Sequence, residues 1–366
     1  MSSSVLAAVM PAPRMPIEVR EFPAPALPRG SALLRTARSE VCGTDVHLWH
    51  GRLSGVPYPI IPGHVTTGTL EEVRGPLTDV DGALLREGDR VAFFDVHRTC
   101  GRCRACTVNQ TPTRYPSRRV YGITDSAAEG LFGGWSQKVY LEPGVVMARL
   151  PAAVSFDAYI GGGCGLLTAV HVIERARLKL GDSVVVQGAG AVGLSVAALA
   201  RRSGAGQVIV IGGPADRLTL ATAMGADTAM ALESSTADSR LERVYELTHG
   251  GADVVVEAAG SAQAFEEGVR LARDGGTYVI AGHYTNVGDS RINAHRDINR
   301  KHLDIRGCWG SEVRHFLRAL QALERYGQDV PWHKIGARTF GLSEINVALA
   351  AAESLSIPKA LVDPWR

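Results

Sequence analysis

The sequence has almost no charge imbalance. Lys and Arg together number 39 and Asp and Glu 37, a formal net charge of +2. Such a chain has no broad electrostatic field that would attract nucleic acids or other polyanions. The opening residues, MSSSVLAAVMPAPRMP, have no basic stretch followed by an apolar core, so we expect no signal peptide and a cytoplasmic location. The apolar fraction of 45% is ordinary for a globular protein with a sizeable core.

Long uninterrupted apolar runs are also missing. The most apolar stretch, residues 183–200, contains Gln187 and several glycines, which argues against a membrane span. Cysteines are few, at six. Without a secretion signal, clustered cysteines favour metal binding over disulfides.

Two patterns divide the 366 residues, a length that fits about two domains. The first 150 or so are rich in Pro, Gly and short apolar runs and show no clean helical period, which indicates an irregular all-β unit with strands near 31–39, 90–96 and 136–141. From residue 182 onward, continuously apolar strands alternate with helices, as in a parallel sheet covered on both faces. The expected strands are 182–187, 207–213, 252–260 and 275–282, and the expected helices are 189–205 and 216–227. The end of the chain adds an amphipathic helix at 311–327 and a short strand at 358–366.

A glycine loop, GAGAVG, follows the first of these strands and opens a helix. Gly188 would make the tight turn, Gly190 would let the backbone approach a pyrophosphate, and Gly193 would allow close packing of helix on strand. The helix that begins with Ala191 and Val192 would stabilise the phosphate charge through its N-terminus. The context predicts dinucleotide binding, although the same glycines also fit a turn in an ordinary α/β fold.

The next strand ends without the acidic residue that usually binds the ribose of NAD. Gly212 occupies that position, and Arg217, five residues later, would be close enough to bind a 2′-phosphate. Because no carboxylate is present there to repel a 2′-phosphate, the pattern favours NADP over NAD. The alternative is that Arg217 is a surface residue and that NAD binds through backbone contacts.

Two cysteines and a histidine outside the cysteine-rich string carry further chemistry. Cys42, His64 and Cys164 are the ligand types of a catalytic zinc that keeps its fourth position open. They are far apart in the sequence, so spacing alone does not join them, and each also fits a core position.

The motifs CGTDVHLWHGR, EAAG and GGTYVIAGH together resemble the zinc-dependent medium-chain alcohol dehydrogenases, particularly the polyol, sorbitol-like and threonine dehydrogenase branches. The resemblance covers essentially the whole chain. It implies an α/β protein with a GroES-like catalytic domain at 1–165, completed by 310–366, a Rossmann domain at 166–309, and a substrate cleft between them. It also implies a homodimer or homotetramer and a hydroxylated or carbonyl substrate.

The resemblance assigns roles to individual residues. Cys42, His64 and Cys164 would hold the catalytic zinc. Thr44 would pass the substrate's proton toward the cofactor ribose and His47, and Asp45 would orient His64 from behind. Two thiolates neutralise Zn²⁺ and leave a Lewis acid that can lower the pKa of a hydroxyl toward about 7.

The chain departs from this family at two places. The acid that usually follows the zinc histidine is replaced by Val65. The second departure is in CGRCRAC, where Cys100, Cys103 and Cys106 resemble a structural zinc lobe whose fourth cysteine would fall at Arg114. A guanidinium cannot bind zinc. We therefore expect no tightly held metal in this lobe, with His97 as a substitute ligand or a three-cysteine zinc site as alternatives.

Three functions remain open. The first is a zinc-dependent, NAD(P)-linked dehydrogenase that interconverts a secondary alcohol, of a polyol or cyclitol type, and a ketone. The second is a reductase of an activated carbon–carbon double bond on the same fold, which the loss of the acid at Val65 keeps open. The third is a non-catalytic cofactor-binding protein.

Overall fold

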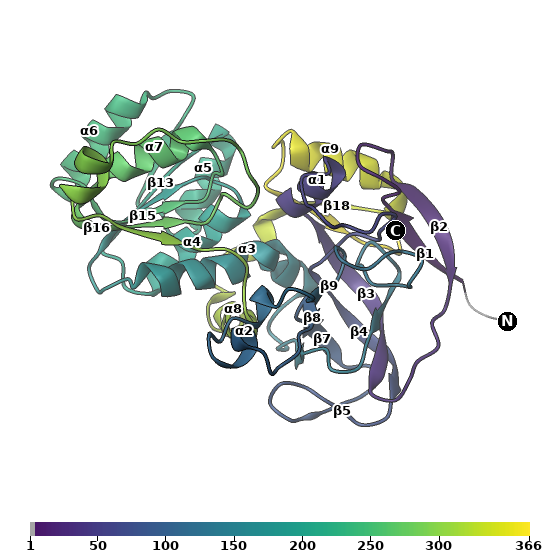
Figure 1. Ribbon diagram of the computed structural model, residues 1–366. Coiled ribbons are helices and arrows are strands. Elements are labelled where there is room, and N and C mark those ends of the chain that lie inside the picture. Colours follow the sequence, from purple (N-terminus) through teal and green to yellow (C-terminus); the bar gives the residue numbers. More distant parts are fainter. Residues whose placement is uncertain (1–3) are drawn as a thin grey trace. The chain divides into compact units, whose positions relative to one another are not determined.

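The computed structural model describes residues 4–366. The chain forms two compact units (Figure 1). The first contains the chain up to Gly163 together with Glu312–Gly327 and Gly336–Arg366, and the second contains Cys164–Ser311 and Gln328–Ile335.

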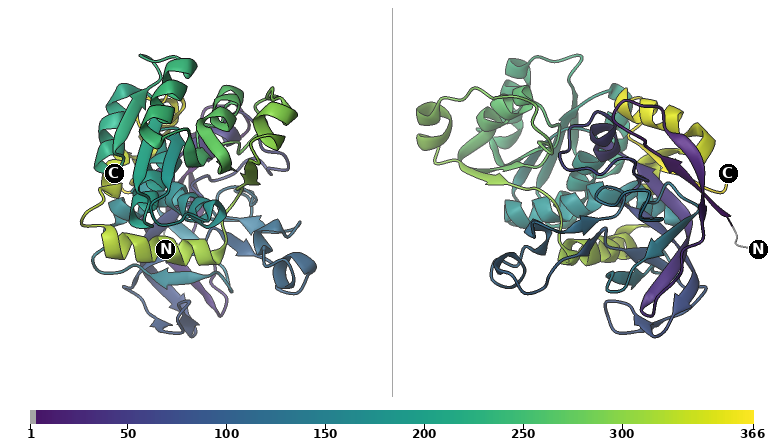
Figure 2. Two further views of the ribbon diagram at one scale, coloured as in Figure 1. Left: turned by 90° about the vertical axis from the view of Figure 1, so that its left-hand side faces the viewer. Right: turned by 45° about the vertical axis from the view of Figure 1, so that its right-hand side comes forward.

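The first unit is built on a seven-stranded sheet with the order β11-β7-β4-β3-β19-β18, in which β10 also pairs with β3. Its strands are β3 (Ser31–Val41), β4 (Thr66–Arg74), β7 (Arg90–Phe93), β10 (Lys138–Leu141), β11 (Met147–Arg149), β18 (Gly336–Phe340) and β19 (Lys359–Val362). The C-terminal β19 lies antiparallel beside β3, so strands far apart in the sequence are neighbours in this sheet (Figure 2). The strands that the sequence predicts at 31–39, 90–96 and 136–141 are confirmed in β3, β7 and β10.

Shorter elements complete this unit. They are the strands β1 (Ser4–Val9), β2 (Glu18–Pro23), β5 (Leu77–Thr78), β6 (Leu84–Leu85), β8 (Val96–Arg98) and β9 (Arg119–Val120), the helices α1 (Gly43–Trp49), α2 (Arg104–Thr107), α8 (Val313–Tyr326) and α9 (Ile345–Glu353), and the 3₁₀ turns η1 (Pro112–Arg114) and η4 (Leu342–Glu344). The expectation of a purely β unit is wrong at α1 and α2. Both helices are at most two turns long, too short for an apolar period to become visible.

The second unit contains a six-stranded sheet with the order β14-β13-β12-β15-β16-β17, and every pair in it is parallel. Its strands are β12 (Ser183–Gln187), β13 (Gln207–Gly212), β14 (Thr228–Ala231), β15 (Ala252–Glu257), β16 (Ala272–Ile280) and β17 (Asp304–Gly307). This order reverses between β12 and β15, as in dinucleotide-binding sheets. The predicted α/β class with a doubly wound parallel sheet is confirmed.

Helices cover both faces of this sheet, with α4 on one face and α6 and α7 on the other (Figure 1). The helices are α4 (Ala191–Arg202), α5 (Ala215–Ala223), α6 (Ala237–Thr248), α7 (Ala262–Leu271), the π-helical turn η2 (Ala294–Asn299) and the 3₁₀ turn η3 (Trp332–Lys334). Residues 183–200, the most apolar stretch, are divided between β12 and α4.

One further helix, α3 (Phe156–Ala176), runs through the boundary between the two units and is interrupted at Gly163 (φ 46°, ψ −144°). Among the described residues, this helix is long and apolar enough to cross a membrane by length and composition, and 61% of its most apolar window is buried inside the structure. Buried core helices of globular proteins have the same composition, so this is weak evidence for a membrane span.

Candidate functional site

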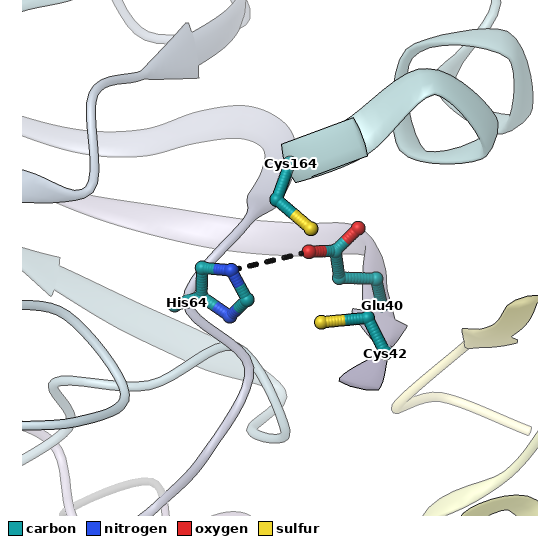
Figure 3. Close-up of side chains that lie close together, drawn as sticks. All are labelled: Glu40, Cys42, His64 and Cys164. Atoms are coloured by element: carbon teal, nitrogen blue, oxygen red, sulfur yellow. Dashed lines mark ion pairs between the residues drawn. The ribbon is translucent and has the colours of Figure 1, made fainter. Parts of the chain in front are cut away.

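Four metal-binding side chains converge in the structure. Glu40, Cys42, His64 and Cys164 each present one donor atom, and these four atoms all lie within 4.8 Å of one another. The side chains point toward a common centre (Figure 3). The structure therefore brings together the three residues that the resemblance names as zinc ligands and adds Glu40, which the sequence analysis missed.

Cys42 lies where β3 passes into helix α1. It is the N-cap residue of that helix, and its backbone N–H donates to Asp45 Oδ2 at 2.8 Å. Asp45 is fully buried, and this burial raises its pKa to about 6 even though the nearby His64 lowers it. The Asp45 carboxylate thus accepts a hydrogen bond from the Cys42 backbone, and this bond fixes the turn that carries the Cys42 thiol. The proposed orientation of His64 by Asp45 remains a prediction.

His64 is placed by the pairing of β3 with β4. Ser39 faces Thr66 across the ladder, and Ser39 Oγ donates to the Val65 carbonyl oxygen at 3.2 Å. The next residue, Glu40, also donates its backbone N–H to that carbonyl, at 3.3 Å. This register puts the side chains of Glu40 and His64 beside one another, with Glu40 Oε1 3.4 Å from His64 Nε2.

Cys164 follows Gly163, the residue that interrupts α3. A Cβ atom at Gly163 would lie 2.0 Å from Glu40 Oε2 and 2.3 Å from Lys359 Nζ. Because Gly163 also has a positive φ, both its backbone conformation and its surroundings require glycine. The break in the helix is what turns Cys164 toward the other donors.

Lys359 is a second residue that the sequence analysis missed. Its ammonium group lies 2.5 Å from Glu40 Oε2, and both side chains are fully buried. Lys359 also donates to the carbonyl oxygens of Ile160 and Gly162. A glutamate two residues before Cys42 and a lysine in the otherwise apolar segment KALV were the signals available in the sequence.

Thr44 and His47 are three residues apart on α1 and therefore lie on the same face of the helix. Burial lowers the pKa of His47, and the positive charges of Arg52 and His50 lower it further. Arg52 Nη1 lies 3.4 Å from His47 Nδ1. Both effects favour the neutral imidazole, which can accept a proton.

The donor set fits zinc. Two cysteine thiolates, one imidazole and one carboxylate are ligands that Zn²⁺ takes in proteins, and their mutual separations suit a single ion. A softer metal would favour sulfur ligands alone, and a harder metal would favour oxygen ligands alone.

The cysteine-rich string forms a separate group. Cys100, Cys103 and Cys106 bring their sulfur atoms within 4.8 Å of one another, and Cys106 Sγ lies 3.5 Å from Cys103 Sγ and 3.8 Å from Cys100 Sγ. Hydrogen bonds, above all from the backbone N–H of Arg102, lower the pKa of Cys100 to about 7. Arg114, in the position of the absent fourth cysteine, is exposed on η1.

His97 does not join these cysteines among the described residues. Its side chain is fully buried, packs edge-on against Tyr121, and lies 3.5 Å from Asp125 and 3.8 Å from Glu142. His97 as the substitute fourth ligand was therefore wrong. The imidazole is held inside the first unit by the two carboxylates and the aromatic ring.

The glycine loop of the second unit joins β12 to α4. Gly188 has a φ of 120°, and a Cβ at Gly193 would lie 1.9 Å from the Gly188 carbonyl oxygen, so the turn and the close packing both require glycine. Gly190 is the N-cap of α4, and a Cβ there would meet nothing within 4 Å. Ala191 and Val192 open the helix. The empty space at Gly190 and the helix N-terminus fit a pyrophosphate group.

The residues near the C-terminal end of β13 differ from the sequence-based expectation in two ways, the burial of Arg217 and the presence of a nearby carboxylate. Arg217, in the first turn of α5, is buried with 7% of its surface exposed, and burial lowers its pKa. Its interpretation as a surface residue was therefore wrong. The position of Gly212 carries no acid, but a carboxylate approaches from the neighbouring loop, because Glu233 Oε1 would lie 2.4 Å from a Cβ at Gly213.

Comparison with protein families and with relatives agrees with this architecture. Residues 28–152 match the alcohol dehydrogenase GroES-like domain, and residues 191–325 match the zinc-binding dehydrogenase family. The chain is 33% identical over 339 residues to 5-exo-hydroxycamphor dehydrogenase of Pseudomonas putida, covering 91% of this chain and 92% of the relative. It is also 33% identical to a protein of Arthroderma otae named as a D-xylulose reductase A, covering 73% of this chain and 72% of the relative.

Solved structures give the same result. An alcohol dehydrogenase from Thermotoga maritima has a TM-score of 0.94 at 32% identity and covers 99% of both chains. A Sinorhizobium meliloti protein assigned as a zinc-binding dehydrogenase, solved with NADP bound, has a TM-score of 0.85 at 25% identity and covers 99% of this chain and 100% of its own. The chain belongs to the zinc-dependent medium-chain dehydrogenase/reductase family and is a zinc alcohol dehydrogenase-like oxidoreductase.

Proposed function

We propose that this protein interconverts a secondary alcohol and a ketone, with Cys42, His64 and Cys164 holding the catalytic zinc. The observation that carries the proposal is the convergence of these three donors directly before helix α1, which bears Thr44 and His47. Zinc, when bound, supplies the Lewis acidity that lowers the pKa of the substrate hydroxyl, and NAD(P) accepts or returns the hydride.

The side chains of α1 handle the proton. In alcohol oxidation the carbon–hydrogen bond breaks with its electron pair going to the nicotinamide, the hydroxyl loses its proton, and the carbonyl double bond forms. Thr44 accepts the hydroxyl proton and passes its own on, and His47, whose neutral form is favoured by the lowered pKa, takes up the proton and releases it to water. Ketone reduction reverses these transfers.

The favoured substrate is a polyol or cyclitol. This choice is supported by the similarity of the CGTDVHLWHGR segment to polyol dehydrogenases and by the relative named as a D-xylulose reductase. The relative that acts on hydroxycamphor suggests cyclic secondary alcohols as a further group for the same panel.

NADP is the favoured cofactor. The absence of an acid at Gly212 supports this choice, as does the relative solved with NADP. Glu233 opposes it, because its carboxylate approaches the same end of the sheet and would repel a 2′-phosphate. We further propose a cytoplasmic enzyme that assembles as a homodimer or homotetramer, with the edge strand β17 as a candidate contact.

A panel assay tests the proposal. Purified zinc-loaded protein is mixed with NADPH or NADH and polyhydroxy ketones, cyclic ketones or activated alkenes, and cofactor oxidation is followed. The proposal predicts turnover of ketones and, in the reverse direction, of the matching alcohols. Turnover of alkenes alone would replace it with double-bond reduction, and the absence of turnover with every member would favour a non-catalytic cofactor-binding protein.

A further inference from the structure

We infer that Glu40 is a fourth protein ligand of the metal at Cys42, His64 and Cys164, and that Lys359 is the positioning residue that holds its carboxylate. The inference rests on the proposed function, since it adds to the same metal site. It restores the carboxylate that Val65 no longer supplies, but from another strand.

The first support is the position of one carboxylate oxygen. Glu40 Oε1 lies 3.4 Å from His64 Nε2. Zinc binds nitrogen and oxygen at about 2.0–2.2 Å, so two such ligands of a tetrahedral ion stand roughly 3.4 Å apart. The separation in the structure is the one that shared coordination requires, and it is reached with the sulfur atoms of Cys42 and Cys164 inside the same group.

The second support is the way the other oxygen is held. Lys359 Nζ lies 2.5 Å from Glu40 Oε2, and it also donates to Ile160 O at 3.1 Å and to Gly162 O at 3.3 Å. The ammonium thus directs three bonds, one to the carboxylate and two to the turn that precedes Cys164. Fixing one oxygen leaves the other directed at the cluster, as Figure 3 shows for Glu40 and His64.

The third support is charge. Glu40 and Lys359 are both 0% exposed, and a buried charge must be balanced by partners. A Zn²⁺ ion with the thiolates of Cys42 and Cys164 is neutral, the carboxylate adds one negative charge, and the ammonium cancels it. The five groups together bury no net charge.

The consequence concerns access to the metal. Four protein ligands are typical of closed zinc sites, whereas catalysis requires a position for substrate. Glu40 would then be the ligand that exchanges with substrate. Lys359 holds its Oε2 atom, so the carboxylate would stay in place when Oε1 leaves the metal.

Zinc affinity and cobalt spectroscopy test the inference on the full-length protein. Glu40→Gln removes the charged donor, and the double variant Glu40→Gln with Lys359→Met removes the buried lysine charge as well, so that folding is preserved in at least one background. Glu71→Gln is the matched control, because Glu71 also pairs with a lysine, Lys138, but its side chain is 37% exposed rather than fully buried. Zinc dissociation constants are measured by chelator competition, and visible spectra are recorded after replacement of zinc by Co²⁺.

The inference predicts that zinc dissociates at least about tenfold more readily from both Glu40 variants. It also predicts a changed cobalt spectrum in both and no change in Glu71→Gln. Unchanged affinity and an unchanged spectrum in the Glu40 variants would overturn the inference and leave the proposed function intact, with Glu40 and Lys359 serving only as a structural ion pair. A wild-type protein that binds no zinc at this site would instead contradict the proposed function itself.

Discussion

The backbone N–H of Glu40 donates to the carbonyl oxygen of Val65 over 3.3 Å, directly beyond Ser39 and Thr66, the last residue pair of the β3–β4 ladder. Val65 directly follows His64, and Glu40 joins His64, Cys42 and Cys164 from the neighbouring strand. This backbone pairing places the carboxylate of Glu40 beside the imidazole of His64, a relationship that exists only in the folded sheet.

Replacing Lys359 by Met should destabilise the metal-free protein by about 3–5 kcal/mol, because Glu40 would then be a buried charge without its ion-pair partner. Urea unfolding followed by circular dichroism measures the loss. The double variant with Glu40→Gln should recover most of it, since neither charge remains.

The partly exposed pair of Lys138 and Glu71, whose side chains are 13% and 37% exposed, provides the comparison. Lys138→Met should cost about 1 kcal/mol or less, because solvent reaches this pair and screens its charges. Equal losses for Lys359→Met and Lys138→Met would show that burial of the Glu40 pair has no special effect.

Thr44→Ala should lower kcat for ketone reduction by about 10²–10⁴-fold, the usual contribution of a positioned proton-transfer group. Thr44→Ser, which keeps the hydroxyl, should retain most of the activity. Both variants should bind zinc as the wild type does, and this is checked by metal analysis. Full activity in Thr44→Ala would remove Thr44 from the proton path.

Arg52→Gln should raise the pKa of His47 toward its ordinary value, because a nearby positive charge makes protonation of the imidazole less favourable. Burial also lowers this pKa and is retained in the variant, so the rise should be partial. Titration of the imidazole proton signals by NMR, assigned with His47→Asn, measures both values. A His47 pKa that falls or stays the same in Arg52→Gln would contradict the electrostatic cause.

Glu233→Gln should shift cofactor preference toward NADP by roughly fivefold in the ratio of kcat/KM values, which corresponds to about 1 kcal/mol for one nearby charge. The carboxylate lies beside Gly213 at the end of β13, where a 2′-phosphate would approach. Glu242→Gln, an exposed residue on α6, is the control. An unchanged ratio would place Glu233 outside the cofactor site.

The parallel sheet could be predicted because its strands are buried on both faces and therefore read as continuous apolar runs, as in Val184, Val185 and Val186. Helix α3 could not, since its GGGCG segment is typical of a loop and the helix is in fact interrupted at Gly163. Helix α1 is too short to show a period, and it begins through the hydrogen bond between Asp45 and Cys42.

The candidate metal site likewise could be predicted only in part from the sequence. Cys42, His64 and Cys164 were grouped through a family resemblance, because their spacing carries no signal of its own. Glu40 and Lys359 are separated by 319 positions, and only the antiparallel pairing of β19 with β3 brings them together. Patterns within a short stretch of sequence cannot predict a contact between residues this far apart.

The most direct test of the account is the zinc content of two variants purified without oxygen. We propose that the catalytic metal binds at Cys42, His64 and Cys164, and we expect no tightly held metal at Cys100, Cys103 and Cys106. A triple Cys→Ser variant of the lobe should therefore keep one zinc per chain, and Cys42→Ser should keep none. A triple variant without zinc, or a Cys42→Ser protein that retains it, would contradict the account.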